Sequence, residues 1–158
     1  MDDKQPITAE GYKKIQEEHQ QLIRVERPKI IEAIEVARAH GDLKENAEYH
    51  AAREKQSFVE GRIQRLNHII ANSNIIDLSK QEGVKQVRFG AKVTYKDLDT
   101  EEETTWQIVG EEEADIKERK ISLKSPIAQA LMGRTEGDEV TLRVPKGNIE
   151  VELVKVGY

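Results

Sequence analysis

Two long stretches of helical character meet at Gly41, and they constrain this 158-residue chain more than any other feature. From Thr8, a suitable N-cap, to His40 the only glycine is Gly11, and the second stretch runs from Asp42 to about residue 72. Each stretch exceeds about 25 residues, which is typical of coiled coils rather than of ordinary globular helices. Because helices commonly end at glycine, the sequence predicts an antiparallel hairpin of two helices over residues 8–40 and 43–72.

Apolar residues face one another when these two stretches are paired antiparallel about a turn centred near residues 41–44. The pairing sets His19 opposite Leu66, and it also sets the following apolar residues opposite each other: Ile15 and Ile70, Leu22 and Ile63, Ile34 and Ala51. A coiled coil requires such a seam. At about 1.5 Å per residue the arms would reach on the order of 45 Å, and Pro28 should bend or locally break the first arm.

From Val87 onward the pattern changes to short runs rich in β-branched residues. Ser125 and Pro126 resemble an N-cap and a first helical residue, and Gly133 resembles a helix end, so a short helix is predicted over 126–132. A turn is predicted at 145–148. The predicted strands are 87–95, 104–109, 120–123, 139–144 and 149–156. The chain is therefore predicted to be α+β, with a hairpin domain over 1–76 and a small α+β domain over 77–158.

Composition narrows the class of protein. The chain has no cysteine, shows no apolar leader and has no stretch of the roughly 20 apolar residues that a membrane span needs, so we expect a cytoplasmic protein without a membrane partner. The net charge of −5 argues against DNA as the main independent partner, although local basic spots could touch nucleic acid held by another protein. The acidic runs 101–103 and 111–113 are interpreted as solvated loop charge.

The segment around the predicted turn carries an unusual density of polar groups. Asp42 and Glu45 have the spacing of a capping box, and capping alone could explain both carboxylates. However, one helical turn needs a single cap, and Lys44, Asn46 and Glu48 also gather there. Paired carboxylates at a protruding point can instead complete the coordination of a loosely held Mg²⁺, which proteins often bind through one or two carboxylates.

Flanking residues leave further alternatives open. Arg38 and Arg53 lie close to the turn in the hairpin pairing, and they are equally consistent with ion pairing inside the hairpin and with contacts to nucleic-acid phosphate or to acidic groups of a partner protein. Tyr49 could stack on a base or pack on the hairpin end, and we favour stacking because the tip offers little core. His40 and His50 lack metal-ligand spacing and are interpreted as surface residues.

The run GDLKENAEYHAARE (41–54) resembles the hairpin tip of the Gre family of bacterial transcript-cleavage factors. Several other runs are similar to the GreA type: RPKIIEAIEVARAHGDLKENAEY (27–49), EGRI (60–63), FGAKVTY (89–95), QIVGEEEAD (107–115) and ISLKSPIAQALMG (121–133). The similarity covers nearly the whole chain. The tip run together with SPIAQALMG is highly specific.

This resemblance implies a function. Gre factors insert their coiled coil into the secondary channel of RNA polymerase, where the acidic pair matched here by Asp42 and Glu45 helps the active centre hold its second Mg²⁺ and position a water. The polymerase then cuts the backtracked RNA near its nascent 3′ end, so the factor is not itself an enzyme and has no cofactor of its own. The C-terminal domain resembles the FKBP type and docks on the polymerase, and the docking segment matches Ser125, Pro126, Ile127 and Leu131.

Two other classes of function are weighed against this one. One is a regulator that enters the same polymerase channel but inhibits the polymerase instead of stimulating cleavage. Such a regulator would not need both Asp42 and Glu45, so the presence of both residues counts against it. A prolyl isomerase needs an aromatic-lined pocket, but residues 77–158 contain only Phe89, Tyr95, Trp106 and Tyr158 as aromatic residues. Fold resemblance alone is in any case a poor guide to function.

Overall fold

The computed structural model describes residues 4–41 and 46–158, and its contacts divide the chain into two compact units. One unit is the helical hairpin over Tyr12–Ser73, and the other combines the segment up to Gly11 with Asn74–Tyr158. The sequence-based division placed the N-terminal segment with the hairpin. The structure groups it with the second unit because strand β1 (Gln5–Thr8) pairs with β2 (Ser73–Ile76).

The hairpin begins with α1 (Ala9–Gln21), which is followed by a π-helical segment η1 (Leu22–Glu26) and by α2 (Arg27–Ala39). Thr8 caps α1 as predicted, because its hydroxyl accepts a hydrogen bond of 3.0 Å from the N–H of Gly11. The α-helical pattern breaks immediately before Pro28, where the N–H of Arg27 bonds to Leu22 O. Proline lacks an N–H and disturbs the preceding turn, so the predicted local break is confirmed.

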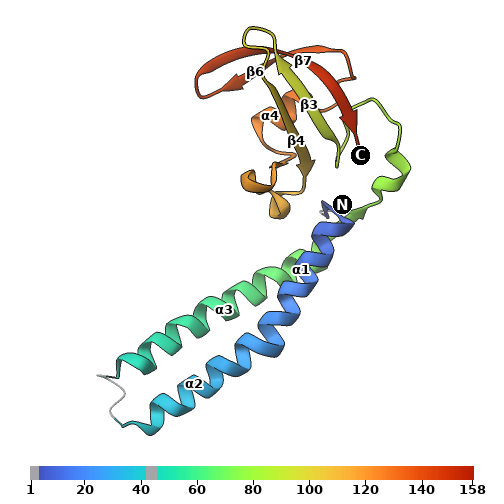
Figure 1. The fold of residues 1–158 in the computed structure, drawn as a ribbon. Coiled ribbons are helices and arrows are strands. Elements are labelled where there is room, and N and C mark those ends of the chain that lie inside the picture. The colour runs from blue at the N-terminus through green and yellow to red at the C-terminus, as the bar shows by residue number, and fades with distance from the viewer. Residues whose placement is uncertain (1–3, 42–45) are drawn as a thin grey trace. The chain divides into compact units, whose positions relative to one another are not determined.

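Helix α3 (Ala47–Asn72) returns antiparallel beside α2, as Figure 1 shows. A cluster of buried side chains joins the two arms: Ile30, Ile34, Ala52, Val59 and Ile63. Two bidentate ion pairs also cross between the arms. Arg27 meets Glu60 at 2.7 and 2.8 Å, and Arg62 meets Glu18 at 2.9 and 2.8 Å. The hydrogen bond from Arg27 lowers the pKa of the Glu60 carboxyl.

The contacts between the arms agree with the sequence-based pairing at some positions, since Leu22 packs on the cluster that contains Ile63, and differ from it at others. His19 Nε2 lies 2.6 Å from Asn67 Oδ1, the neighbour of the fully buried Leu66, and Ala52 is buried where Ala51 was expected. The expected pairing assumed a second helix that starts directly after Gly41. The helix instead begins at Ala47.

The second unit is built on a five-stranded sheet in the order β5-β4-β3-β7-β6, antiparallel except between β4 and β5. Its strands are β3 (Lys92–Asp97), β4 (Glu103–Val109), β5 (Lys120–Ser122), β6 (Glu139–Val144) and β7 (Gly147–Gly157). The short helix α4 (Pro126–Leu131) packs on the sheet through Ala128 and Leu131, both fully buried (Figure 1). The predicted α+β class is confirmed.

Three short 3₁₀ turns complete the second unit: η2 (Leu78–Gln81), η3 (Glu111–Glu113) and η4 (Ile116–Glu118). Two sequence-based boundaries need correction. Val87 is not in a strand, because it exchanges hydrogen bonds with Gly133 and Arg134 in the turn after α4. The last hairpin turn is shorter than predicted, since Val144 pairs directly with Gly147, whose φ of +124° favours glycine.

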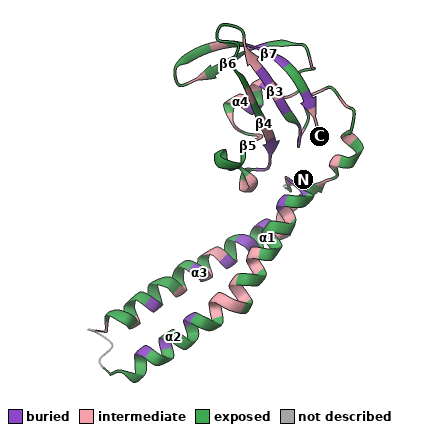
Figure 2. Cartoon of the chain, viewed as in Figure 1, coloured by how far each residue is buried: buried purple, intermediate pink, exposed green. Residues whose placement is uncertain are grey.

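The hairpin helices carry both buried and exposed residues. Figure 2 shows buried residues recurring among exposed ones along α2 and α3. Among residues 4–41 and 46–158, no helix combines the length and the apolar character that a membrane span needs.

Candidate functional site at the hairpin end

The end of the hairpin is held by Asn46, whose side chain bonds to both arms. Its Oδ1 accepts a hydrogen bond of 3.0 Å from the N–H of Tyr49, which caps α3, and its Nδ2 donates one of 2.7 Å to Ala37 O near the end of α2. Asparagine is among the best N-cap residues, but a second bond to the opposite helix is not visible from sequence. Asn46 therefore fixes the spacing between the two arms where they meet.

The carboxylates predicted to act at this end, Asp42 and Glu45, lie outside the described residues together with Lys44. The structure bears on the capping alternative all the same. Because the cap of α3 is Asn46, the expectation that the second helix begins at Asp42 is wrong. On the other side of the segment, α2 ends at His40 and Gly41, where φ of +111° at Gly41 is a conformation that favours glycine.

Other residues predicted to support the tip differ in their surroundings. Arg38, Glu48 and Arg53 are exposed, and neither arginine forms an ion pair with another residue in the described part of the chain. This absence weakens the expectation of ion pairing within the hairpin for the two arginines, and their contact with RNA or polymerase stays a prediction. The structure thus leaves three exposed charges around the connection between α2 and α3.

Tyr49 packs against the buried cluster of the hairpin, and its ring also meets that of His50 edge-on at a centroid distance of 5.6 Å. The premise that the tip offers little to pack against is therefore wrong for this residue. A packed ring also positions the first turn of α3. Stacking of Tyr49 on a base stays a prediction without structural support.

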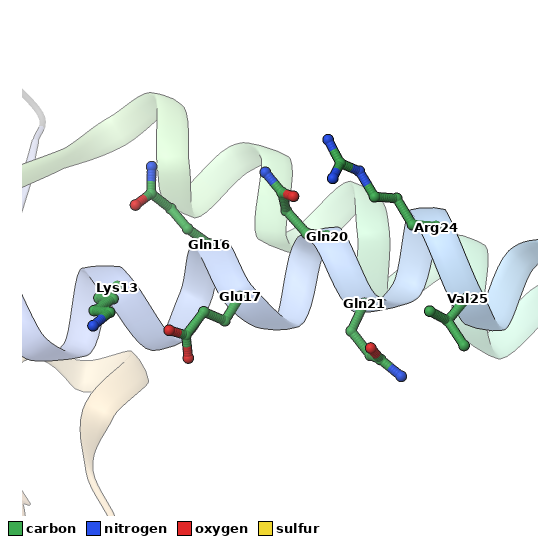
Figure 3. Close-up of a pocket in the computed structure, with 7 residues that line it drawn as sticks. All are labelled: Lys13, Gln16, Glu17, Gln20, Gln21, Arg24 and Val25. Atoms are coloured by element: carbon green, nitrogen blue, oxygen red, sulfur yellow. The ribbon is translucent and has the colours of Figure 1, made fainter.

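A hollow of about 460 Å³ lies along α1 and η1, away from the hairpin end in sequence (Figure 3). Its lining consists of Lys13, Gln16, Glu17, Gln20, Gln21, Arg24 and Val25. All seven come from one continuous helical stretch, and Figure 3 shows them spread along it rather than converging on a common point. We therefore do not place the chemistry of the molecule in this hollow.

The predicted docking segment lies at the start of α4. Ser125 is its N-cap, accepting a hydrogen bond of 3.2 Å from the N–H of Ala128, and Pro126 is exposed. Leu131 is fully buried in the core, which leaves Ile127 as the apolar residue of this segment that can contact a partner. Ile127 is half-buried and keeps part of its side chain accessible.

Glu113 is a residue whose role the sequence did not reveal. The acidic run 111–113 was interpreted as solvated charge, which is wrong for this residue. Its carboxylate accepts hydrogen bonds from the N–H of Thr8 at 3.1 Å, from the Thr8 hydroxyl and from the N–H of Gly110 at 2.9 Å. Glu111 is also paired, with Lys124 at 3.3 Å. Glu113 therefore links the N-terminal segment to the second unit, which is built on the five-stranded sheet and is called the sheet unit below.

Among the residues that the structure describes, no group of three or more His, Asp or Glu side chains could hold a metal ion. His40 and His50 are both exposed. The predicted donors of a metal site are Asp42 and Glu45 alone. Two carboxylates suit Mg²⁺ in kind but fill only part of its octahedral shell, so the donor set fits an ion shared with another protein.

Comparison with known proteins identifies the class. A family described as "Transcription elongation factor, N-terminal" matches residues 5–75, and one described as "Transcription elongation factor, GreA/GreB, C-term" matches residues 80–158. The two matches correspond to the hairpin and to the sheet unit. Together they define a transcription elongation factor.

Individual relatives agree with these matches. A protein named transcription elongation factor GreA from Hyphomonas neptunium is 58% identical over 153 residues, covering 97% of each chain. Its namesake from Nitrosococcus oceani is 54% identical over 155 residues, covering 98% of each. The crystal structure of Gfh1, GreA factor homolog 1 of Thermus thermophilus, is 25% identical with a TM-score of 0.44, covering 98% of this chain and 99% of that one. The family matches and the sequence identities place the chain in the GreA/GreB family of transcription elongation factors.

Substituting Asn46 should loosen the hairpin end. Asn46→Ala removes both the cap and the bond to Ala37 O, and we expect a loss of about 1–2 kcal/mol in local stability. Asn46→Asp keeps a good cap but places a carboxylate against a carbonyl oxygen, so it should cost an intermediate amount. Amide hydrogen exchange of the first turn of α3 would measure both losses. Equal protection in Asn46→Asp and the parent would show that the bond to Ala37 contributes nothing.

Proposed function

We propose that this elongation factor stimulates RNA cleavage by bacterial RNA polymerase, with its hairpin inserted through the secondary channel toward the active centre. One observation carries the proposal: α2 and α3 pack as antiparallel arms whose connection, between Gly41 and Asn46, contains Asp42 and Glu45. Helix α3 alone has 26 residues, which corresponds to about 39 Å of reach. Such an arm can carry two carboxylates far from the rest of the chain.

In this proposal Asp42 and Glu45 hold a Mg²⁺ ion jointly with carboxylates of the polymerase. When bound, that ion lowers the pKa of a coordinated water and so supplies a nucleophile for the phosphodiester. The chain's own contribution is to bring the two carboxylates to the ion and to fix them there. Asn46 joins the arms at the base of the connection, and Tyr49 packs the first turn of α3.

The factor has no catalytic centre of its own in this proposal, because the bond-breaking groups belong to the polymerase. Its partners are the polymerase elongation complex and the nascent RNA 3′ end, and DNA is at most a weak partner for a chain with a net charge of −5. The exposed Arg38 and Arg53 are suited to contact RNA phosphate near the hairpin end. Its site of action would be the cytoplasm, where the polymerase works.

A prolyl isomerase gains no support from the sheet unit. Tyr95, Trp106 and Tyr158 are engaged in packing and hydrogen bonds. Trp106 Nε1 donates to the Tyr95 hydroxyl at 3.0 Å, and the Tyr158 hydroxyl donates to Gln86 O at 2.6 Å. Burial raises the pKa of the Tyr158 hydroxyl.

One experiment tests the proposal directly. The purified protein is added to a stalled, backtracked elongation complex, and the radiolabelled RNA is followed over time. We expect shortened RNA and, after nucleotides are added, renewed elongation. If the protein binds the polymerase and the RNA keeps its length, the protein is a regulator that enters the channel without stimulating cleavage, and the proposal is wrong.

Ile127 provides a test of the docking assignment. Ile127→Gln should weaken binding to polymerase by about tenfold, because a partly exposed apolar side chain at the start of α4 is lost from the contact. The control is Val154→Gln, which changes an exposed apolar side chain on β7 and should bind like the parent. A competition assay would measure both affinities after circular dichroism confirms folding. Equal affinities for the two variants would remove Ile127 from the docking surface.

A further inference from the structure

The outer face of α3 combines two features that the hairpin itself does not use. The side chain of Phe58 is 77% exposed although aromatic side chains gain most from burial. Gly61 follows three residues later, so it lies one turn along on the same face of the helix. Buried residues recur along α3 among exposed ones (Figure 2), and Ala52, Val59 and Ile63 are the ones that pack with α2.

Gly61 has no visible role within the described structure. It lies in the interior of α3, where glycine is the poorest helix former except proline. A Cβ atom added there would meet nothing within 4 Å, so packing does not require glycine. Its neighbours Glu60 and Arg62 form bidentate ion pairs with the other arm. Because these ion pairs hold the two arms together beside Gly61, the glycine is not explained as a hinge. A glycine retained under these conditions suits the close approach of another backbone.

The charges around these two residues indicate the kind of partner. Lys55 and Arg65 are exposed at three residues before Phe58 and four residues after Gly61, so both border the same face. Exposed Glu54 stands beside Lys55, so the face is not uniformly basic. A surface that binds RNA backbone needs a denser array of cations, whereas an aromatic side chain with a few flanking charges is typical of a protein contact.

We propose that Phe58, Gly61, Lys55 and Arg65 form a contact surface for a helix of RNA polymerase. The polymerase helix would pass close to Gly61, offer an apolar recess to the ring of Phe58 and carry carboxylates opposite Lys55 and Arg65. This inference rests on the proposed insertion of the hairpin into polymerase. It assigns to the middle of α3 a binding role that is separate from the chemistry expected of Asp42 and Glu45.

Gly61→Ala separates this role from hairpin stability. Alanine is the better helix former and meets no atoms in the free protein, so the melting temperature should rise by a few degrees. The added methyl group should nevertheless weaken polymerase binding about tenfold, because it holds the two backbones apart. Phe58→Ala should also weaken binding about tenfold or more. The control is Val36→Ala, which removes an exposed apolar side chain from α2 and should bind polymerase like the parent. Cleavage at saturating concentrations of either variant should equal that of the parent.

Replacing Phe58 by p-benzoylphenylalanine, a similar aromatic residue that crosslinks on illumination, identifies the partner. In a purified elongation complex we expect a crosslink to a protein chain of the polymerase. A crosslink to RNA or to a second copy of this chain, or no crosslink at all, would overturn the proposal, as would unchanged affinity in Gly61→Ala and Phe58→Ala. If the parent protein itself does not bind polymerase, the proposed function fails instead, so the two failures are distinguishable.

Discussion

Asp42→Asn and Glu45→Gln should each reduce stimulated RNA cleavage by about 100-fold, and the double variant by at least as much, as the loss of other catalytic electrostatic groups does. Each change preserves the size and shape of the side chain but removes its negative charge. A neutral amide is a much poorer ligand for Mg²⁺ than a carboxylate is. Folding should change little, because α3 takes its cap from Asn46 and not from either of these residues.

Two further measurements separate chemistry from binding in these variants. Affinity for polymerase should equal that of the parent, because most of the proposed contact lies along the arms and in the sheet unit. Raised Mg²⁺ should partly restore cleavage, since mass action offsets a weakened site. Glu35→Gln neutralises an exposed carboxylate on α2 and serves as the control. Full activity in both amide variants would mean that the two carboxylates take no part in the chemistry.

Local sequence signals predicted the elements that depend on interactions between residues close together in the chain. The hairpin followed from helix length and the glycine at 41, and α4 followed from Ser125, Pro126 and Gly133, whose φ is +83°. The break before Pro28 followed from its missing N–H. In each case the deciding interaction joins residues within about one helical turn, which a sequence displays directly.

Features that depend on residues distant in the chain were not predictable in this way. The start of α3 at Ala47 was not predicted because it is set by the bonds of Asn46, one of which reaches back to Ala37. Leu131 was assigned to the docking segment by resemblance, and such a match does not tell which side of α4 meets the sheet. Glu113 looked like loop charge because its partner Thr8 is 105 residues away. Sequence shows which residues can bond but not which distant partner they find.

Glu113→Ala should destabilise the sheet unit by about 3 kcal/mol, because hydrogen bonds to a charged acceptor contribute about 1.5–3 kcal/mol and their loss leaves donors unsatisfied. Two donors come from Thr8 and one from Gly110, and Thr8 is itself buried. Glu113→Gln keeps one carbonyl acceptor and should lose about half as much. Trp106, the single tryptophan of the chain, lies in β4 and reports unfolding of this unit by fluorescence in urea.

Gly11 allows a sharper version of the same test. A Cβ atom at Gly11 would lie 2.0 Å from Glu113 Oε1, so Gly11→Ala must push the carboxylate out of its bonds and should cost nearly as much as Glu113→Ala. In the Glu113→Ala background that collision is absent, and alanine is the better residue in the first turn of α1. The second substitution should then be neutral or slightly stabilising, a non-additivity of about 2–3 kcal/mol that only residues in contact produce. Additive losses in urea denaturation would show that Glu113 does not hold the N-terminal segment in solution.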